Sequence, residues 1–427
     1  MNLLHKCILL ISMVFVFLFS MMTVNVSAGQ PAEKKLRYRN ILLRDFRTVK
    51  DGQVINFNIG TAAHAPATLA VLKKYLPPEV KITVWADAPL APELAEMMAR
   101  RFPEVLIVHG DLNNAPPAEL LKAVDEADLF LVSSGSTITA AVGHSMDAFL
   151  KRTGKPAAAY AIGCTPRLLP RLDHLDFVWL RDPIAAEIAK KSRCPIQGWA
   201  PDAVFDFDAV DKKSAERFMK EKGLTPGQFI CCIPGQRYTP RWQFFNIPEN
   251  LQKVAENRKF EEHDNAVLRE VIRIAVTEYG LKVLICPEQI TEIALIRPRI
   301  FDRLPPEIQK NCVTTDKMWS PDVALGVYRA SRGVFGVEIH SQVMAVGSGV
   351  PGVVLAPPQF GSKSEMWKSI GLPEWLIYTD SPDYAEKVVA VSRDILSFPE
   401  KNAAKLQRAR KIINTASRNA IHSSFFQ

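Results

Sequence analysis

The segment from Gly333 to Trp367 reads GVFGVEIHSQVMAVGSGVPGVVLAPPQFGSKSEMW and combines the patterns of a strand, a helix and a second strand. It opens with GVFGV, an apolar run bounded by glycine, which is typical of a buried parallel strand. The residues from His340 to Val346 carry apolar side chains at helical spacing, and the run from Val350 to Leu355 predicts the next strand. The segment therefore predicts a βαβ unit whose helix begins at the carboxyl end of a strand.

His340 and Ser341 lie in the expected turn between this strand and this helix, two residues after Glu338. In open α/β sheets ligands bind at the carboxyl ends of strands, and the free N–H groups of a helix N-terminus favour an anion. We expect Ser341 to cap the helix. Because a histidine in such a turn is often only a satisfied polar group, its position alone leaves a structural and a functional role open.

The composition indicates an ordinary globular chain. Its 427 residues have room for about two to three domains, and 48% hydrophobic and 23% charged residues exclude disordered and fibrous classes. The net charge of +8 is not accompanied by a long basic run interleaved with aromatic residues, so we expect a solvated basic face and no nucleic-acid partner. The cysteines lack zinc-site spacing, so we expect neither a metal nor a disulfide framework.

The first 28 residues are expected to be a signal peptide or a membrane anchor. The run from Cys7 to Val24 contains no charge. The small residues before Gly29 resemble a cleavage site, and cleavage near Ala28 would give a secreted or periplasmic protein. The basic residues between positions 34 and 44 outnumber Lys6, however, and the positive-inside rule then places an uncleaved protein on the cytoplasmic face. This charge bias favours the anchored form.

After an expected linker over residues 29–50, strand-like runs alternate with helical patterns. The alternation predicts parallel, doubly wound sheets. A charged helix from Lys212 to Lys222 marks the seam between a domain at 51–210 and one at 211–395, and a C-terminal helix is expected within 396–427. The expected strands of the first domain run from Val54 to Ile59, Ile82 to Trp85, Val105 to Val108, Leu129 to Val132, Ala157 to Ile162 and Phe177 to Leu180.

The second domain repeats this rhythm. Strands are expected from Phe229 to Ile233 and from Val283 to Cys286, with a long helix from about Asn265 to Tyr279 between them. The polar and aromatic residues from Gln236 to Glu262 predict an irregular insertion, either beside the cleft or on the surface.

One loop and one strand end in the first domain are further candidates for binding. The backbone N–H groups of Ser134, Gly135 and Ser136 can hold a phosphate or sugar hydroxyls, although a turn that packs a helix on the sheet has the same composition. Arg181 ends an expected strand and can bind an anion or form a structural ion pair with Asp182.

Taken together, these motifs resemble the polysaccharide pyruvyl transferase family. The resemblance covers roughly residues 54–375, and the family has an arginine where this chain has Glu338. The matching motifs are Asn58-Ile59-Gly60, the strand and loop from Asp128 to Gly135, Arg181-Asp182, the turn from Pro201 to Phe205, Ile339-His340, Gly349-Val350-Pro351 and Lys363.

The resemblance implies two Rossmann-like domains that face a cleft, which is the glycosyltransferase-B architecture. It also implies a transferase that moves the pyruvyl group of phosphoenolpyruvate onto a sugar as a ketal, in exopolysaccharide or cell-envelope synthesis. The partners would then be phosphoenolpyruvate, as co-substrate and without a further cofactor, and a glycan or lipid-linked sugar. The alternatives are a nucleotide-sugar glycosyltransferase of the same architecture and a non-catalytic glycan-binding envelope protein.

The same resemblance suggests roles for single residues. His340 would be the catalytic proton carrier, since a histidine exchanges protons near neutral pH. Ser341 and Lys363 would contact the donor phosphate, and Glu338 would repel it, unless Arg332 supplies the missing positive charge. The weaker candidates for substrate binding are Arg181, Ser134, Gly135, Ser136, Asn58 and Gly60.

Overall fold

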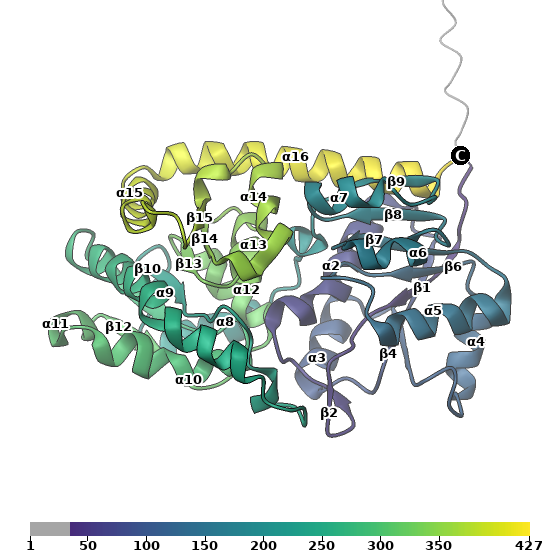
Figure 1. Cartoon of the computed structure of the whole chain (residues 1–427), viewed down its shortest axis with the longest axis horizontal. Coiled ribbons are helices and arrows are strands. Elements are labelled where there is room, and N and C mark those ends of the chain that lie inside the picture. Colours follow the sequence, from purple (N-terminus) through teal and green to yellow (C-terminus); the bar gives the residue numbers. More distant parts are fainter. Residues whose placement is uncertain (1–34) are drawn as a thin grey trace, which may run out of the picture. The chain divides into compact units, whose positions relative to one another are not determined.

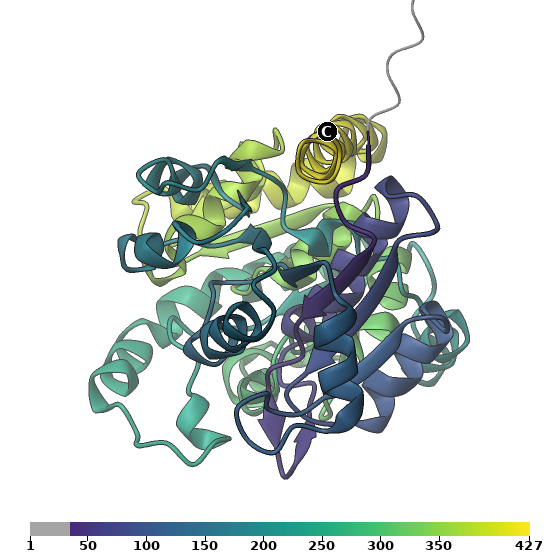
Figure 2. The same ribbon diagram turned by 90° about the vertical axis from the view of Figure 1, so that its right-hand side faces the viewer.

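The structure is a computed structural model that describes residues 35–427. Within that range the long strands form two parallel sheets, and helices cover both faces of each sheet (Figures 1 and 2). A short antiparallel hairpin joins β2 (Val49–Lys50) to β3 (Gln53–Val54). The predicted class, α/β with two Rossmann-like doubly wound domains, is confirmed.

The first sheet has the strand order β5-β4-β1-β6-β7-β8-β9, with every pair parallel. The chain moves outward from β1 on one side and then returns to its other side at β6, so the topological switch point lies between β1 and β6. The strands are β1 (Asn40–Arg44), β4 (Lys81–Ala86), β5 (Leu106–His109), β6 (Leu129–Val132), β7 (Ala157–Ile162), β8 (Phe177–Leu180) and β9 (Ile196–Trp199). The helices are α2 (Ile59–Tyr75), α3 (Pro92–Arg101), α4 (Ala118–Glu126), α5 (Ala140–Thr153), α6 (Leu169–Leu172) and α7 (Pro183–Ala189).

The second sheet has the strand order β12-β11-β10-β13-β14-β15, again parallel, with its switch point between β10 and β13. Its strands are β10 (Phe229–Ile233), β11 (Lys282–Ile285), β12 (Cys312–Thr314), β13 (Val334–Gly336), β14 (Gly352–Ala356) and β15 (Leu376–Tyr378). The helices are α8 (Lys212–Glu221), α9 (Leu251–Thr277), α10 (Ile293–Leu295), α11 (Pro306–Gln309), α12 (Pro321–Ala330), α13 (His340–Gly347), α14 (Met366–Ser369), α15 (Tyr384–Ser397) and α16 (Pro399–Phe425).

The central strands are marked in the sequence by unbroken apolar runs. Every residue of β7, AAAYAI, and of β10, FICCI, is buried, because helices cover both faces of a parallel sheet and leave no position for an alternating polar residue. The last helix, α16, returns from the second domain to the first. Its Arg410 donates to the carbonyl of Phe205 (2.7 Å), and the carbonyl of Asn414 accepts from the hydroxyl of Tyr75 (3.1 Å).

Three sequence-based expectations about elements are wrong. The expected linker contains β1, a central strand, whose short apolar run ends at Arg44 and is flanked by basic residues that hide the pattern. The expected strand from Val54 to Ile59 is replaced by the β2–β3 hairpin and by α2, which begins at Ile59. The expected insertion from Gln236 to Glu262 contains the first half of α9.

None of the helices described in residues 35–427 is both long enough and apolar enough to cross a membrane. The expected signal peptide or anchor, at residues 1–28, lies outside the described residues.

Candidate active site

His340 is the first residue of α13 and lies just past the carboxyl end of β13, as predicted. Its side chain is 12% exposed. Nδ1 of its ring lies 3.2 Å from Oε1 of Glu288, a residue that follows β11 in the same sheet. Since the carboxyl ends of parallel strands share one edge, β11 and β13 bring this carboxylate and this imidazole together.

Glu288 is fully buried and is held by groups from both domains. Its carboxylate accepts the backbone N–H of Ser341 (2.7 Å) and the side-chain amide of Asn58 (3.3 Å) in addition to its contact with His340. Burial alone would raise the pKa of Glu288, but the interactions with His340 and with the N–H of Ser341 outweigh it, so the pKa lies below the usual carboxyl value. Glu288 therefore remains an anion that orients the imidazole.

The start of α2 packs directly against this pair. Asn58 caps the helix by accepting the N–H of Thr61 (3.0 Å), and the N–H of Ile59 donates to the backbone carbonyl of Glu288 (3.0 Å). A Cβ atom on Gly60 would lie 2.0 Å from Cγ of His340, so only glycine leaves room for the ring. The predicted positions Asn58 and Gly60 thus both touch the His340–Glu288 pair.

A second histidine, His64, lies one turn further along α2. Its ring packs edge to face against His340, with the ring centroids 5.2 Å apart. His64 is 3% exposed, and among the described residues neither of its ring nitrogens has a hydrogen-bond partner. Burial lowers the pKa of His64 well below its usual value, and the nearby Asp202 only partly opposes this, so the imidazole is neutral at pH 7.

Asp202 closes the other side of His64. Its Oδ1 lies 3.9 Å from Nε2 of His64 and accepts from the hydroxyl of Ser134 (3.0 Å), while its Oδ2 pairs with Arg181 (3.0 Å). Burial opposes ionisation, but the charge of Arg181 and the backbone N–H of Val204 help to hold the pKa of Asp202 below its usual value. The predicted residues Ser134 and Arg181 therefore reach the His64–His340 centre through Asp202, and Arg181 pairs with Asp202 rather than with the neighbouring Asp182.

The other two residues of the predicted Ser134–Ser136 loop, Gly135 and Ser136, face in different directions. Gly135 faces the centre, because a Cβ on it would lie 2.9 Å from a guanidinium nitrogen of Arg47 and 3.8 Å from Nδ1 of His64. Ser136 is exposed. The backbone carbonyl of Ser136 sits against Gly163, where a Cβ would meet it at 2.3 Å. This loop is therefore both a tight packing turn and one wall of the site.

Glu338 has a different environment from the one that the sequence suggested. It is 6% exposed and accepts from the amide of Gln289 (2.6 Å). Burial and the charge of Glu288 raise the pKa of Glu338 to about 7, while Lys363 opposes the shift. Burial, with the charges of Glu338 and Glu288, also raises the pKa of Glu292 well above its usual value, so the expected full negative charge is reduced near neutral pH.

Lys363 is half-buried near these carboxylates, with its ammonium 3.9 Å from the ring centroid of Phe360. Burial lowers the pKa of Lys363, and the charge of Glu338 works in the opposite direction. This predicted residue therefore belongs to the same site, and together with Arg181 it supplies cationic groups there.

Two predicted positions need correction. Arg332 precedes β13 and so lies at the amino edge of the sheet, opposite His340, where its guanidinium donates to the carbonyl of Leu396 (2.6 Å). Ser341 does not cap α13, which begins one residue earlier with Ile339 at the cap position. The N–H of Ser341 donates to Glu288, and its hydroxyl accepts from Tyr328 (3.1 Å), so both groups are already bonded.

Sequence reasoning missed His64 as a functional residue and gave no role to Asp202 and Glu288. A pattern within α2 could not have found His64, because the helix is apolar on nearly every side and a single histidine resembles a core residue. Asp202 and Glu288 each follow a proline after a strand, and that position was the available signal.

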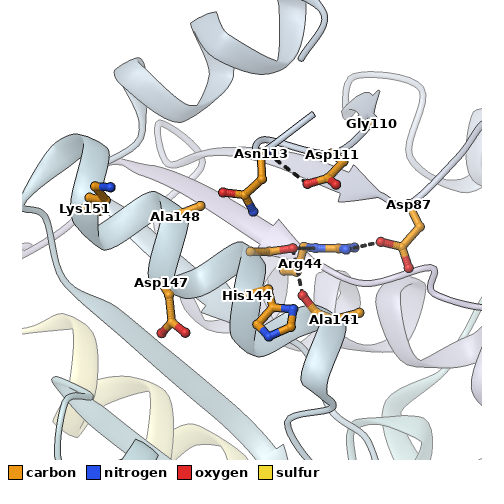
Figure 3. Close-up of a pocket in the computed structure, with 11 residues that line it drawn as sticks. Arg44, Asp87, Gly110, Asp111, Asn113, Ala141, His144, Asp147, Ala148 and Lys151 are labelled. Atoms are coloured by element: carbon orange, nitrogen blue, oxygen red, sulfur yellow. Dashed lines mark hydrogen bonds and ion pairs between the residues drawn. The ribbon is translucent and has the colours of Figure 1, made fainter. Parts of the chain in front are cut away.

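A separate polar cavity of about 650 Å³ opens at the carboxyl ends of β1, β4 and β5, against α5 (Figure 3). Arg44 forms its floor. The guanidinium of Arg44 pairs with Asp87, bonds the carbonyls of Asp45 (3.1 Å) and Trp85 (3.2 Å), and lies 4.8 Å from the Trp85 ring centroid. The other polar side chains on its walls are Asp111, Asn113, His144, Ser145, Asp147 and Lys151.

Solved structures share this architecture. S. aureus MnaA, solved with UDP, has a TM-score of 0.54 and 14% identity over 90% of this chain and 96% of that chain. The UDP-GlcNAc 2-epimerase of Neisseria meningitidis, bound to UDP-GlcNAc, has a TM-score of 0.52 and 13% identity over 90% and 99%. ADP-heptose LPS heptosyltransferase II of E. coli has a TM-score of 0.50 and 12% identity over 84% and 99%. These similarities show the glycosyltransferase-B fold alone.

Comparison by sequence adds the family. No curated protein matches this chain. The model of the family described as polysaccharide pyruvyl transferase matches residues 58–358, which span Asn58 at the start of α2, the Ser134 loop, Arg181, Glu288 and the His340 turn. With this match over more than half of its length, the chain belongs to the polysaccharide pyruvyl transferase family.

Proposed function

We propose that this protein transfers the pyruvyl group of phosphoenolpyruvate to two hydroxyl groups of a glycan sugar, forming a ketal and releasing phosphate. The observation that carries the proposal is the pair of His340 and Glu288 beside His64, at a sheet edge where two strands end. Family membership gives the class of reaction, and this pair supplies a group able to move the protons that the reaction requires.

The reaction has a simple proton balance. Two sugar hydroxyls bond to the enol carbon, the methylene group becomes a methyl group by gaining one proton, and the departing phosphate takes the other. Glu288 holds Nδ1 of His340, so Nε2 is the nitrogen that exchanges protons with substrate. His64 packs against the imidazole and limits its rotation.

The anionic donor needs cations that are not fully engaged. Nε of Arg181 is buried and has no hydrogen-bond partner within residues 35–427, and Lys363 contributes a second positive charge. Such groups stabilise a phosphate or carboxylate strongly in a site from which water is excluded. The raised pKa values of Glu338 and Glu292 reduce the repulsion that Glu338 would otherwise exert on the donor.

The acceptor sugar binds, in this proposal, in the polar cavity above Arg44 (Figure 3). Its volume of about 650 Å³ and its mixture of carboxylates, one amide, one imidazole and one amine match a ligand that carries many hydroxyls. The residues that line the cavity are separate from the His340 centre, and the two are linked through the residues after Arg44: Asp45 accepts from the hydroxyl of Ser133, and Arg47 lies next to Gly135. A lipid-linked glycan is the natural acceptor if residues 1–28 hold the protein at the cytoplasmic face of a membrane.

Calorimetry on the purified chain tests the proposal. Phosphoenolpyruvate should bind and should bind more weakly to Arg181→Gln and Lys363→Gln, with Lys411→Gln as an exposed control. The structural neighbours favour one rival, a nucleotide-sugar glycosyltransferase, since two of them were solved with UDP or UDP-GlcNAc. Binding of UDP-GlcNAc but not of phosphoenolpyruvate would contradict the proposal in favour of that rival. Affinity for a glycan without turnover of any donor would favour a non-catalytic glycan-binding protein.

A further inference from the structure

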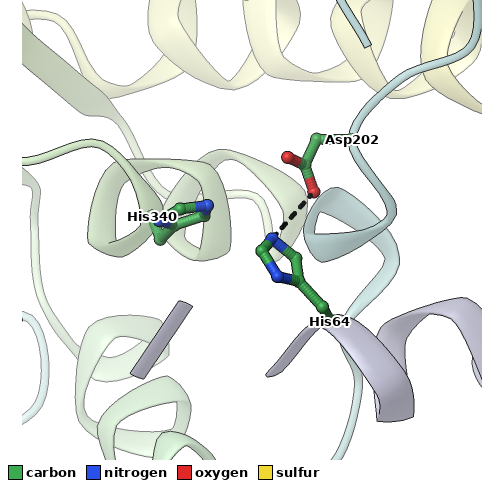
Figure 4. A group of neighbouring side chains, drawn as sticks. All are labelled: His64, Asp202 and His340. Atoms are coloured by element: carbon green, nitrogen blue, oxygen red, sulfur yellow. Dashed lines mark ion pairs between the residues drawn. The ribbon is translucent and has the colours of Figure 1, made fainter. Parts of the chain in front are cut away.

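Three side chains come together at the proposed reaction centre, although proton transfer by His340 does not need all three. His64 from α2, Asp202 from the turn before η2 (Ala203–Asp206) and His340 from α13 place one possible ligand atom each within 4.8 Å of one another (Figure 4). Nε2 of His64 lies 3.9 Å from Oδ1 of Asp202. Two imidazoles and one carboxylate are a donor set that zinc and related divalent ions accept.

Among the described residues, both histidines have ring nitrogens that lack a hydrogen-bond partner. His64 is 3% exposed, and in the part of the chain that the structure describes neither of its nitrogens meets a donor or an acceptor. Nε2 of His340 is also buried and lacks a partner among the described residues. A buried polar atom without a partner is destabilising, so a ligand that bonds one nitrogen of His64 and Nε2 of His340 at once is stabilising.

The surroundings hold the three ligands as metal sites usually do. A histidine that binds a metal commonly donates its second nitrogen to a carboxylate, and Glu288 stands 3.2 Å from Nδ1 of His340. The hydroxyl of Ser134 and the guanidinium of Arg181 fix the carboxylate of Asp202 in the same manner. The contact with Glu288 leaves Nε2 of His340 available to an ion, whereas Oδ1 of Asp202 already accepts from the hydroxyl of Ser134 (3.0 Å) and the N–H of Val204 (3.0 Å), so an ion shares this oxygen with two hydrogen-bond donors.

We infer that His64, Asp202 and His340 form a binding site for a zinc-like divalent cation. Bonds of about 2.0 to 2.1 Å place tetrahedral ligand atoms roughly 3.4 Å apart, so the three groups must draw together slightly. Three protein ligands leave a fourth position for water or an anion. Arg181, the nearest cation, opposes the ion, and Asp202 and Glu288 balance that charge. The sequence could not indicate this site, because its ligands lie at positions 64, 202 and 340 rather than in a short motif.

The site has one consequence for catalysis, which rests on the proposed function. Nε2 of His340 has a single lone pair, and it cannot hold a metal ion and exchange a proton at the same time. Bound zinc therefore inhibits the pyruvyl transfer reversibly. Metal binding itself does not depend on which reaction the protein catalyses.

The test is titration of the full chain with Zn²⁺ alone, after treatment with a chelator and dialysis. We expect one equivalent to bind, and affinity to fall at least tenfold in His64→Ala and in His340→Gln, as loss of a ligand requires. His144→Ala removes an exposed histidine of the Arg44 cavity and should bind zinc like the parent. Thermal melting of each variant shows whether it is folded, and Co²⁺ in place of Zn²⁺ gives a visible spectrum that reports on geometry.

Binding that is weak, far below one equivalent, or equal in the parent, His64→Ala and His340→Gln would overturn the site. Phosphate release measured with and without Zn²⁺ tests the consequence separately: inhibition that a chelator reverses supports it, and activity that requires Zn²⁺ contradicts it. If no phosphate release occurs under any condition, the proposed function fails while the titration still decides on the site.

Discussion

A Cβ atom on Gly60 would lie 2.0 Å from Cγ of His340, which means that the first turn of α2 leaves space for the imidazole only because position 60 has no side chain. Gly60 belongs to the first domain and His340 to the second. The two residues pack against each other as closely as residues inside a protein core. His340 is thus positioned by Glu288 on one side and by Gly60 on the other.

Gly60→Ala should therefore displace His340. We expect turnover to fall by roughly a hundredfold, since a general acid–base group that is moved loses most of its contribution, and we expect thermal stability to fall as well, because the new Cβ would also meet Cβ of His340 at 2.3 Å, an atom that ring rotation does not move. Gly143→Ala is the matched control, because the atoms nearest to a Cβ at that helical glycine belong to the end of the long side chain of Arg171. Steady-state kinetics and melting curves of both variants provide the measurement, and parent-like turnover in Gly60→Ala would contradict this account of the packing.

Glu288→Gln should destabilise the protein in a way that depends on pH. The pKa of Glu288 is depressed in the folded state, so its charge contributes stability above the ordinary carboxyl pKa and loses that contribution as the pH falls. We expect the variant to be less stable by about 1 to 3 kcal/mol at pH 7, and the difference to shrink toward pH 4. Urea unfolding at several pH values measures it, with the exposed Glu307→Gln as control. A difference independent of pH would show that the charge is not the cause.

Glu338→Gln should stabilise the protein, which is the opposite of the effect expected for Glu288→Gln. Because the pKa of Glu338 is raised to about 7, folding is penalised once the pH exceeds the ordinary carboxyl value, and the penalty is complete above pH 7. A glutamine mimics the protonated form and can donate to Glu292, so the variant should be more stable than the parent by roughly 2 kcal/mol at pH 8 and equal to it near pH 4. Equal stability at pH 8 would mean that Glu338 is ionised without cost.

Most of the fold could be predicted because burial on both faces leaves a clear pattern. The strands β6, β7, β8 and β10 were predicted to the residue, since each is an unbroken apolar run between polar turns. The strand β1 was missed because Arg44 and its basic neighbours resemble a solvated linker, whereas Asp87 and backbone carbonyls satisfy the buried guanidinium. Tertiary partners of that kind cannot be inferred from the local sequence.

Only those site residues that belong to a recognisable sequence motif could be predicted. His340, Asn58, Gly60 and Arg181 lie at strand or helix ends that the sequence marks, and the structure brings them together. The role of His64 and the raised pKa values of Glu292 and Glu338 depend on which side chains meet between the domains and within a buried cluster. The pKa of a carboxyl is set by such neighbours, so the sequence could not show that Glu338 carries less than a full charge.

Substitutions in the cavity above Arg44 should weaken binding of the acceptor glycan and leave binding of the donor unchanged. The double variant Asn113→Ala, Lys151→Ala removes two polar groups from its walls, and we expect the KM for the glycan to rise about tenfold while kcat and the KM for phosphoenolpyruvate stay near the parent values. Lys122→Ala, on the exposed face of α4, is the control. An increase in the KM for phosphoenolpyruvate alone would place the donor in this cavity instead.

The most direct test of the central claim is phosphate release from phosphoenolpyruvate in the presence of a glycan acceptor, measured for the parent and for His340→Gln at neutral pH. The account predicts glycan-dependent release by the parent and a rate at least roughly a hundredfold lower for the variant, with nearly unchanged melting temperature. Equal rates in a folded His340→Gln protein would contradict the assignment of His340 as the group that moves the proton.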